Sequence, residues 1–133
     1  MKLNFIKPVY AHCDAPCGIY ETNTMMYAAA TCTRMIEKIN ELGQFDNVEK
    51  QANFCRYVAI KEQSAQKVKD ELYLLWSDYF KPEHLENHPD LHDIFWQAAK
   101  QAGKVKQTVN VAECQKLTEQ IQNIAHIFNS TKK

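Results

Sequence analysis

The sequence predicts an all-α protein, an antiparallel up-down four-helix bundle. Apolar residues recur every three or four positions in four separate stretches, which is the spacing of one face of a helix. Only 3 glycines and 4 prolines occur among the 133 residues, too few for the frequent tight turns of a β-sandwich. The segments between the stretches are short, and short connections place consecutive helices antiparallel to each other.

The first expected helix follows Glu21-Thr22-Asn23, whose side-chain oxygens suit a helix start, and ends at Gly43. Its inner face holds Met25, Ala29, Cys32, Ile36 and Ile39. The second starts at Asp46, which forms a capping-box pattern with Glu49, and ends before Pro82. It is about 30 residues long, or roughly 45 Å. Its expected apolar stripe is Val48, Ala52, Cys55, Ala59, Ala65, Val68, Leu72, Leu75 and Tyr79.

Gly103 either ends or merely weakens the third expected helix, and Asn110 with Glu113 signals the start of the fourth. The third presents Leu91, Ile94, Phe95, Ala98, Ala99 and Ala102. The fourth presents Val111, Cys114, Leu117, Ile121, Ile124 and Phe128. Free cysteines behave as small hydrophobic residues, so we expect Cys32, Cys55 and Cys114, which lie on the stripes, to be buried.

Composition excludes several functional classes. Sixteen basic residues balance sixteen acidic ones, so no basic surface is expected for nucleic acid or for an anionic membrane. No apolar run approaches the roughly 20 residues that cross a bilayer. Five cysteines are an odd number and do not indicate a disulfide framework. The length is that of one domain.

The chemically richest stretch is His12-Cys13-Asp14-Ala15-Pro16-Cys17-Gly18-Ile19-Tyr20, which we call the hook. Residues 1–11 precede it and lack the apolar centre of a secretory signal. We interpret residues 1–11 as a propeptide that a dedicated protease removes, and residues 12–133 as a mature cytoplasmic protein. Cleavage after Ala11 would give His12 a free α-amine beside its imidazole, and Cys13 and Cys17 would add two thiolates.

Such a set of nitrogen and sulfur donors favours a square-planar ion, Ni(II) or Cu(II). Zinc sites usually combine a cysteine pair with a second pair or with paired histidines, and no second cysteine pair is present. The C-x-x-C-H pattern of c-type haem and the paired Glu-x-x-His pattern of di-iron bundles are also absent. A Cys13–Cys17 disulfide in a purely structural helical module remains an alternative at this point.

The pattern His12-Cys13-Asp14-x-Pro16-Cys17-Gly18-x-Tyr20 closely resembles the hook of nickel superoxide dismutases. A second, independent match lies on the long helix and beyond it. It comprises Ile60-Lys61-Glu62-Gln63, Leu75-Trp76-Ser77-Asp78-Tyr79-Phe80-Lys81-Pro82 and Pro89-x-Leu91-His92. The resemblance covers essentially all of residues 12–133.

The resemblance implies a homohexamer of four-helix bundles with one nickel per chain. It implies that His12, Cys13 and Cys17 bind the metal, with the His12 imidazole as the axial ligand of Ni(III). The enzyme would disproportionate superoxide to O₂ and H₂O₂ through a Ni(III)/Ni(II) cycle. Tyr20 would guard the open face of the metal. Asp14, Tyr79 and Lys81 would order water, supply protons or attract the anion.

The sequence departs from this family at several positions. Glu21-Thr22 stands where Asp-Pro is common. Ala28 and Ser64 stand where some members have a glutamate and an arginine that support the axial imidazole. Both charged partners are missing together, so neither is left unpaired, and we expect a working site with altered support for the His12 ring. The alternative function is a non-catalytic nickel or copper carrier or sensor.

Overall fold

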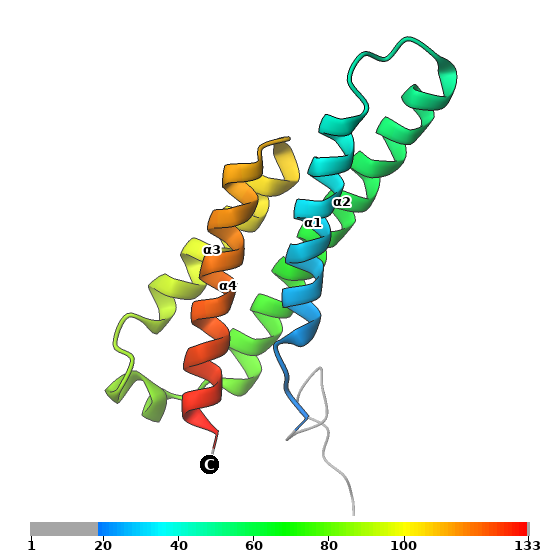
Figure 1. Ribbon diagram of the computed structural model, residues 1–133. Coiled ribbons are helices and arrows are strands. Elements are labelled where there is room, and N and C mark those ends of the chain that lie inside the picture. The colour runs from blue at the N-terminus through cyan, green and yellow to red at the C-terminus, as the bar shows by residue number, and fades with distance from the viewer. Residues whose placement is uncertain (1–18, 133) are drawn as a thin grey trace, which may run out of the picture.

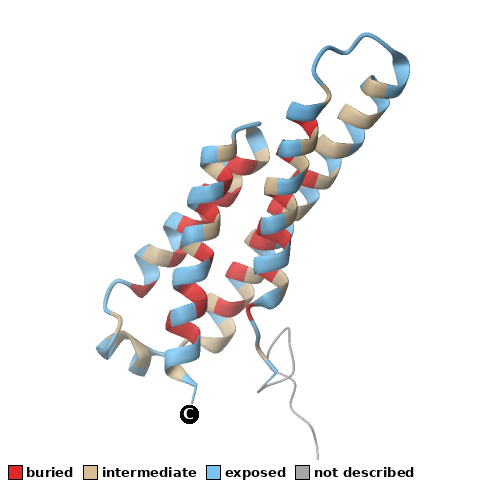
Figure 2. Cartoon of the chain, viewed as in Figure 1, coloured by how far each residue is buried: buried red, intermediate tan, exposed pale blue. Residues whose placement is uncertain are grey.

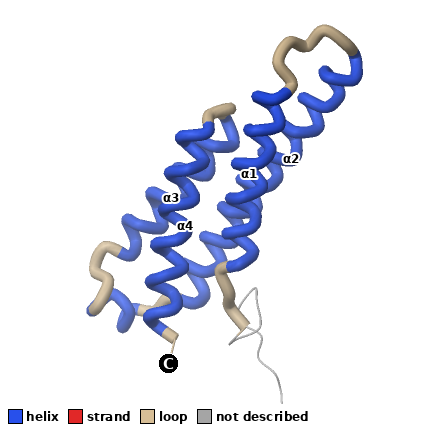
Figure 3. Tube along the Cα trace, viewed as in Figure 1, coloured by secondary structure: helices blue, strands red, loops and turns tan. Residues whose placement is uncertain are grey.

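The computed structural model describes residues 19–132, in which every regular element is helical (Figures 1 and 3). The long helices are α1 (Asn23–Glu41), α2 (Val48–Leu74), α3 (Leu91–Gln107) and α4 (Val111–Thr131). A π-helical turn, η1 (Leu75–Tyr79), and a 3₁₀ turn, η2 (Pro82–Glu86), connect α2 to α3. None of the helices in this range combines the length and the apolar content that crossing a membrane requires.

Each long helix packs against two others. Helices α1 and α3 both contact α2 and α4, and consecutive helices run in opposite directions (Figure 1). This confirms the predicted antiparallel up-down bundle. The start of α1, the end of α2 and the end of α4 lie at one end of the bundle, while the α1–α2 hairpin projects past α3 and α4 at the other end (Figure 1).

The core confirms the predicted faces of three helices. All the residues expected on the inner faces of α1 and α4 are buried except Val111, which is half-buried. On α3 the expected residues are buried except Ile94, which is half-buried. The buried residues lie on the sides of the helices that face one another (Figure 2). Burying one such large side chain contributes about 1.5–3 kcal/mol, so these faces hold the four helices together.

The predicted stripe on α2 is only half right. Ala65, Val68, Leu72 and Leu75 are buried, but Val48, Ala52, Cys55 and Ala59 are exposed. The first half of α2 belongs to the projecting hairpin, where α3 and α4 do not cover it (Figure 2). There the chain packs by other contacts, such as the ring of Phe54 against that of Phe45 at a centroid distance of 4.7 Å. The expectation that Cys55 is buried was therefore wrong, whereas Cys32 and Cys114 are buried as predicted.

The helix starts use side-chain oxygens close to the predicted positions. The Glu21 carboxylate accepts a hydrogen bond from the Thr24 N–H at 3.1 Å. Asn47, rather than Asp46, caps α2 by accepting from the Lys50 N–H at 2.9 Å. Asn110 accepts from the amide of Ala112 at the start of α4. These bonds satisfy amide groups that have no partner within the helix.

Lys61, which the sequence showed only as part of the Ile60-Lys61-Glu62-Gln63 block, binds the end of α3. It is 1% exposed, and its Nζ donates to the carbonyl oxygens of Val105 and Lys106 at 2.8 Å and of Thr108 at 2.7 Å. These carbonyls lie at the end of α3, where they lack partners within the helix. Burial lowers the pKa of Lys61, and the three carbonyls offset that cost by matching the three donors of an ammonium group.

Replacing Lys61 with methionine should lower the free energy of unfolding by about 3 kcal/mol, because three carbonyls at the end of α3 lose a charged donor. Urea unfolding followed by circular dichroism would measure this. The matched control is Lys116→Met on the exposed surface of α4, where the expected change is within about 0.5 kcal/mol. Equal stabilities for the two variants would contradict this role of Lys61.

Candidate functional site

The fold brings Tyr20 and Tyr79 together although 58 residues lie between them in the sequence. Their ring centroids lie 5.5 Å apart in an edge-on arrangement, and both residues are half-buried. Tyr20 stands just before α1, and Tyr79 ends η1. Two of the residues predicted for the site therefore contact each other at the end of the bundle where the described chain begins (Figure 1).

The position of Tyr79 depends on the way α2 ends. The helix widens into the π-helical turn η1, closed by the Phe80 N–H donating to the Leu75 carbonyl at 3.3 Å. Pro82 then prevents the helix from continuing and holds Lys81 in an extended conformation (φ −122°, ψ 162°). Single π-helical turns are frequently found at functional sites. Here the turn coincides with the block of sequence that carries Tyr79 and Lys81.

Tyr79 is packed on several sides by aromatic rings. Its ring centroid lies 4.6 Å from that of Phe128 on α4, 5.0 Å from that of Phe80 and 5.7 Å from that of His84. Its hydroxyl forms a 2.9 Å hydrogen bond with the Thr131 hydroxyl at the end of α4. The phenol group is therefore held by contacts from η1, η2 and α4. The sequence did not identify Phe128 or Thr131 as neighbours of the site.

Within residues 19–132, Lys81 and Lys132 lie at this end of the bundle. Lys81 is exposed and immediately precedes η2. Lys132, which sequence analysis did not single out, places its ammonium group 4.2 Å from the centroid of the Phe128 ring. Cations of this kind can attract a small anion, while the carboxylates of Glu21 and Glu71 lie nearby, beside Tyr20.

The end of the matched sequence, which includes His92, packs against η1. The indole N–H of Trp76 donates to Nδ1 of His92 at 2.9 Å, which ties η1 to the first turn of α3. The Trp76 ring also stacks on that of Phe95, with centroids 6.4 Å apart. The Leu75–Pro82 block and the Pro89-x-Leu91-His92 block are thus in direct contact.

A cavity of about 220 Å³ opens beside Tyr20. The carboxylates of Glu21 and Glu71 and the hydroxyl-bearing Thr24 contribute to its wall. The Glu71 side chain is only 17% exposed and pairs with the Lys67 ammonium at 2.8 Å. Ile19, Leu74 and Leu75 complete the wall, so a hollow of mixed polar and apolar character borders the residues that directly follow the hook.

Ala28 and Ser64 stand at the two positions where some members of the resembled family have a charged pair. Ala28 is buried in the core, and Ser64 is half-buried on α2. Neither side chain carries a charge, so neither position can contribute to an ion pair.

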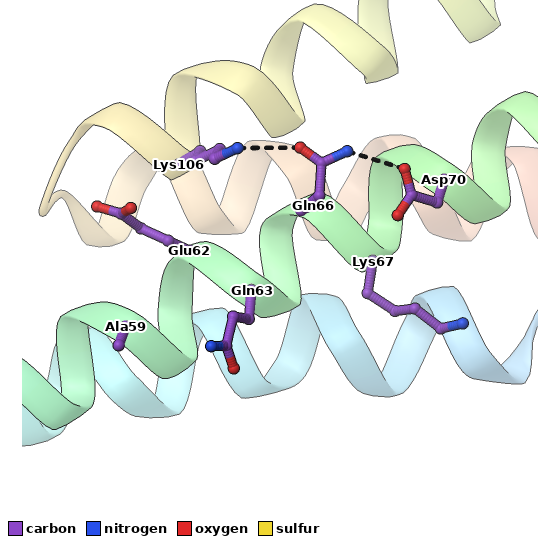
Figure 4. A pocket seen from close by; sticks show the side chains of 7 residues that line it. All are labelled: Ala59, Glu62, Gln63, Gln66, Lys67, Asp70 and Lys106. Carbon is purple, nitrogen blue, oxygen red and sulfur yellow. Dashed lines mark hydrogen bonds between the residues drawn. The ribbon is translucent and has the colours of Figure 1, made fainter.

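A larger hollow, of about 470 Å³, lies on the middle of α2 (Figure 4). There the ammonium of Lys106 donates to the Gln66 carbonyl oxygen at 3.0 Å, and the Gln66 amide donates to Asp70 at 2.8 Å. None of the residues predicted for the site lines this hollow. Three of its polar side chains already bind one another, and we assign it no role.

The buried thiols differ chemically from those predicted to bind metal. Burial raises the pKa of Cys32 to about 12 and also raises that of Cys114. At neutral pH these two groups are thiols, and only thiolates are good metal ligands. Within residues 19–132 no three histidine, cysteine or acidic side chains are grouped so that they could hold a metal ion. The predicted site residues His12, Cys13, Asp14 and Cys17 lie outside the described residues.

Comparison with known proteins identifies the family. Residues 7–132 match the model of the nickel-containing superoxide dismutases. "Superoxide dismutase [Ni]" of Streptomyces seoulensis is 38% identical over 125 residues, which cover 94% of this chain and 91% of that protein. The protein of the same name from Streptomyces coelicolor is 36% identical over 127 residues, with the same coverage.

Solved structures show the same relationship. The native structure of a nickel superoxide dismutase superposes with a TM-score of 0.79 at 37% identity, over 92% of this chain and 100% of that one. A structure of the family in its oxidised ligation state gives a TM-score of 0.78 at the same identity, covering 90% and 97%. On sequence and on fold alike, the chain belongs to the nickel-containing superoxide dismutase family.

Proposed function

We propose that this chain, a nickel-dependent superoxide dismutase, carries out the reaction at its hook, with one nickel per chain held by His12, Cys13 and Cys17. The hook's chemistry fits the metal, because two thiolates, an amine and an imidazole are donors that nickel accepts. The observation that carries the proposal is the contact between Tyr20, which ends the hook, and Tyr79, which belongs to the second matched block.

The overall reaction converts two superoxide anions and two protons into O₂ and H₂O₂. Bound nickel would supply the one-electron Ni(III)/Ni(II) couple. The remaining requirements are to attract an anion, to exclude other ligands and to deliver two protons. Residues of the chain around the hook would meet these three requirements.

We assign these tasks from the contacts at this end of the bundle. Lys81 is exposed, and its charge attracts superoxide. The Tyr79 hydroxyl, hydrogen-bonded to Thr131 at 2.9 Å, holds a proton close to the Tyr20 ring. Tyr20 limits access from this side. Asp14 orders water within the hook.

Maturation and assembly complete the proposal. A protease removes residues 1–11 in the cytoplasm and so creates the α-amine of His12. The mature chains form a homohexamer. The resemblance to the family, which implies a hexamer, is what supports this assembly; single exposed apolar side chains such as Tyr27 are normal on a protein surface and do not identify an interface.

The double variant Tyr20→Phe/Lys81→Ala tests whether the chain is an enzyme or a carrier. We expect nickel content to be unchanged and kcat/KM for superoxide to fall by about tenfold at low salt, since charge steering of anions is typically worth that much or more. Lys81→Ala alone should also weaken the dependence of the rate on ionic strength. Pulse radiolysis would measure the rates.

The matched control for the lost cation is Lys100→Ala on α3, where the ammonium lies 5.4 Å from the centroid of the Trp96 ring. Its kcat/KM should remain that of the unaltered protein. A non-catalytic nickel or copper carrier needs neither Tyr20 nor Lys81. That reading would be favoured if the double variant and the unaltered protein both bound metal and neither accelerated superoxide loss.

A further inference from the structure

His84 contacts both described residues that we assign to proton delivery and anion attraction, yet nothing in the reaction requires a histidine there. It lies at the third position of η2, half-buried. Its Nδ1 is 3.0 Å from the backbone nitrogen of Lys81. Its ring is nearly parallel to that of Tyr79, with an interplanar angle of 12° and centroids 5.7 Å apart.

The bond to Lys81 fixes the tautomer of His84. A backbone N–H can only donate, so Nδ1 is the acceptor and the ring proton is on Nε2. In return, the His84 N–H donates to the Lys81 carbonyl at 3.0 Å. This reciprocal pair closes the start of η2 in the manner of a capping box, with a histidine in place of the usual glutamate or glutamine. It holds the Lys81 backbone at both its amide and its carbonyl.

The ring makes a second, separate set of contacts. It stacks on Tyr79 and meets Phe80 edge-on at a centroid distance of 5.5 Å. The phenol of Tyr79 is fixed at its far end by Thr131, and the His84 ring covers one face of it. The two functions of His84 are thus carried by different atoms, Nδ1 for Lys81 and the ring face for Tyr79.

We infer that His84 is a positioning residue of the superoxide site: its Nδ1 sets the backbone of Lys81, and its ring sets the orientation of Tyr79. This inference rests on the proposed function, because it assigns His84 a role through the two residues placed in that site. It requires no metal contact and no proton transfer by His84 itself.

Two variants separate the two functions. His84→Gln keeps an acceptor that can reach the Lys81 N–H, as in an ordinary capping box, but it removes the ring. His84→Phe keeps a ring that can stack on Tyr79 but removes the acceptor. The matched control is His88→Phe, since the His88 side chain contacts Ser130 at 3.4 Å and has no bond to Lys81.

The first readout is hydrogen–deuterium exchange of the segment 80–86, measured on the processed, nickel-loaded protein. His84→Phe should speed exchange at the Lys81 amide about fivefold or more, as expected for the loss of one hydrogen bond. His84→Gln and His88→Phe should leave it within twofold. Equal exchange in all variants, or equal acceleration in His84→Gln and His84→Phe, would overturn the role of Nδ1.

The second readout is the superoxide rate and its salt dependence. His84→Phe should weaken the salt dependence in the same direction as Lys81→Ala, whereas His84→Gln should keep that dependence and lower kcat. Identical kinetics in both variants would overturn the division of roles. If the unaltered protein proved to have no dismutase activity, the proposed function would fail, while the exchange measurement would still decide whether His84 holds Lys81.

Discussion

Replacing Cys17 with serine is expected to abolish nickel binding and with it the dismutase activity. Serine is a poor donor at neutral pH, because its hydroxyl does not ionise, and the loss leaves one thiolate where the proposed square-planar site needs two. Changes in residues that merely support metal ligands cost about 10- to 100-fold in affinity or activity. Loss of a direct ligand should therefore lower activity by at least about 100-fold. Metal analysis of purified protein and pulse radiolysis would measure both quantities.

Cys55→Ser is the matched control for this experiment. Cys55 is an exposed, free thiol on α2, and its replacement should leave nickel content, rate and helical content unchanged. Cys17→Ser should also keep its helical circular dichroism, because the bundle core is built from residues of α1 to α4. A full complement of nickel in Cys17→Ser would contradict the proposed ligand set.

Blocking removal of the propeptide is expected to have an equally large effect. With Ala11 attached, the nitrogen of His12 is part of a peptide bond and cannot act as an amine ligand. The sharpest comparison is between a chain that begins at His12 and one that begins at Ala11, since they differ by a single residue. The longer chain should show superoxide loss at background level, at least about 100-fold below the shorter one.

Helical content of the two chains, and their thermal unfolding measured without metal, should coincide, because residue 11 is remote in sequence from the core that α1 to α4 form. Full activity of the chain that begins at Ala11 would show that the amine is not needed. Rapid activation of that chain by an added aminopeptidase would support the proposal in the same experiment.

Helices were predictable from the sequence wherever one face meets the rest of the bundle. The spacing on α1 and α4 identified buried residues such as Cys32, Ile36 and Leu117. It failed on the first half of α2, where Val48 and Cys55 continue the same stripe but are exposed. Periodicity shows which residues share a face. It does not show how far the neighbouring helices extend, and here α3 ends and α4 begins without reaching the first half of α2.

The site was predictable only in part, because most of its contacts join residues distant in the sequence. Resemblance to the family indicated Tyr79 and Lys81, and the structure brings Tyr79 against Tyr20. The hydrogen bond between Tyr79 and Thr131 joins η1 to the C-terminal end of α4. No local sequence pattern predicts such a pair. His84 carried a usable signal, since it stands three residues after Lys81 at the start of a helical turn.

Matched motifs also mix residues of different roles. Lys61 belongs to the Ile60-Lys61-Glu62-Gln63 block that supported the resemblance, yet its ammonium binds carbonyls at the end of α3. Trp76 and His92 likewise bind each other. A resemblance in sequence indicates which positions matter to a family, and the contacts decide whether a position serves the fold or the reaction.

The central claim is that the hook of the processed chain holds one nickel ion and disproportionates superoxide. The most direct test is to determine intact mass and nickel content on one preparation of processed protein and to follow superoxide loss by pulse radiolysis. We predict a mass that begins at His12, about one nickel per chain and fast superoxide loss. A chain that begins at His12 with no metal and a mass lower by two hydrogens would mean a Cys13–Cys17 disulfide, and would contradict the account.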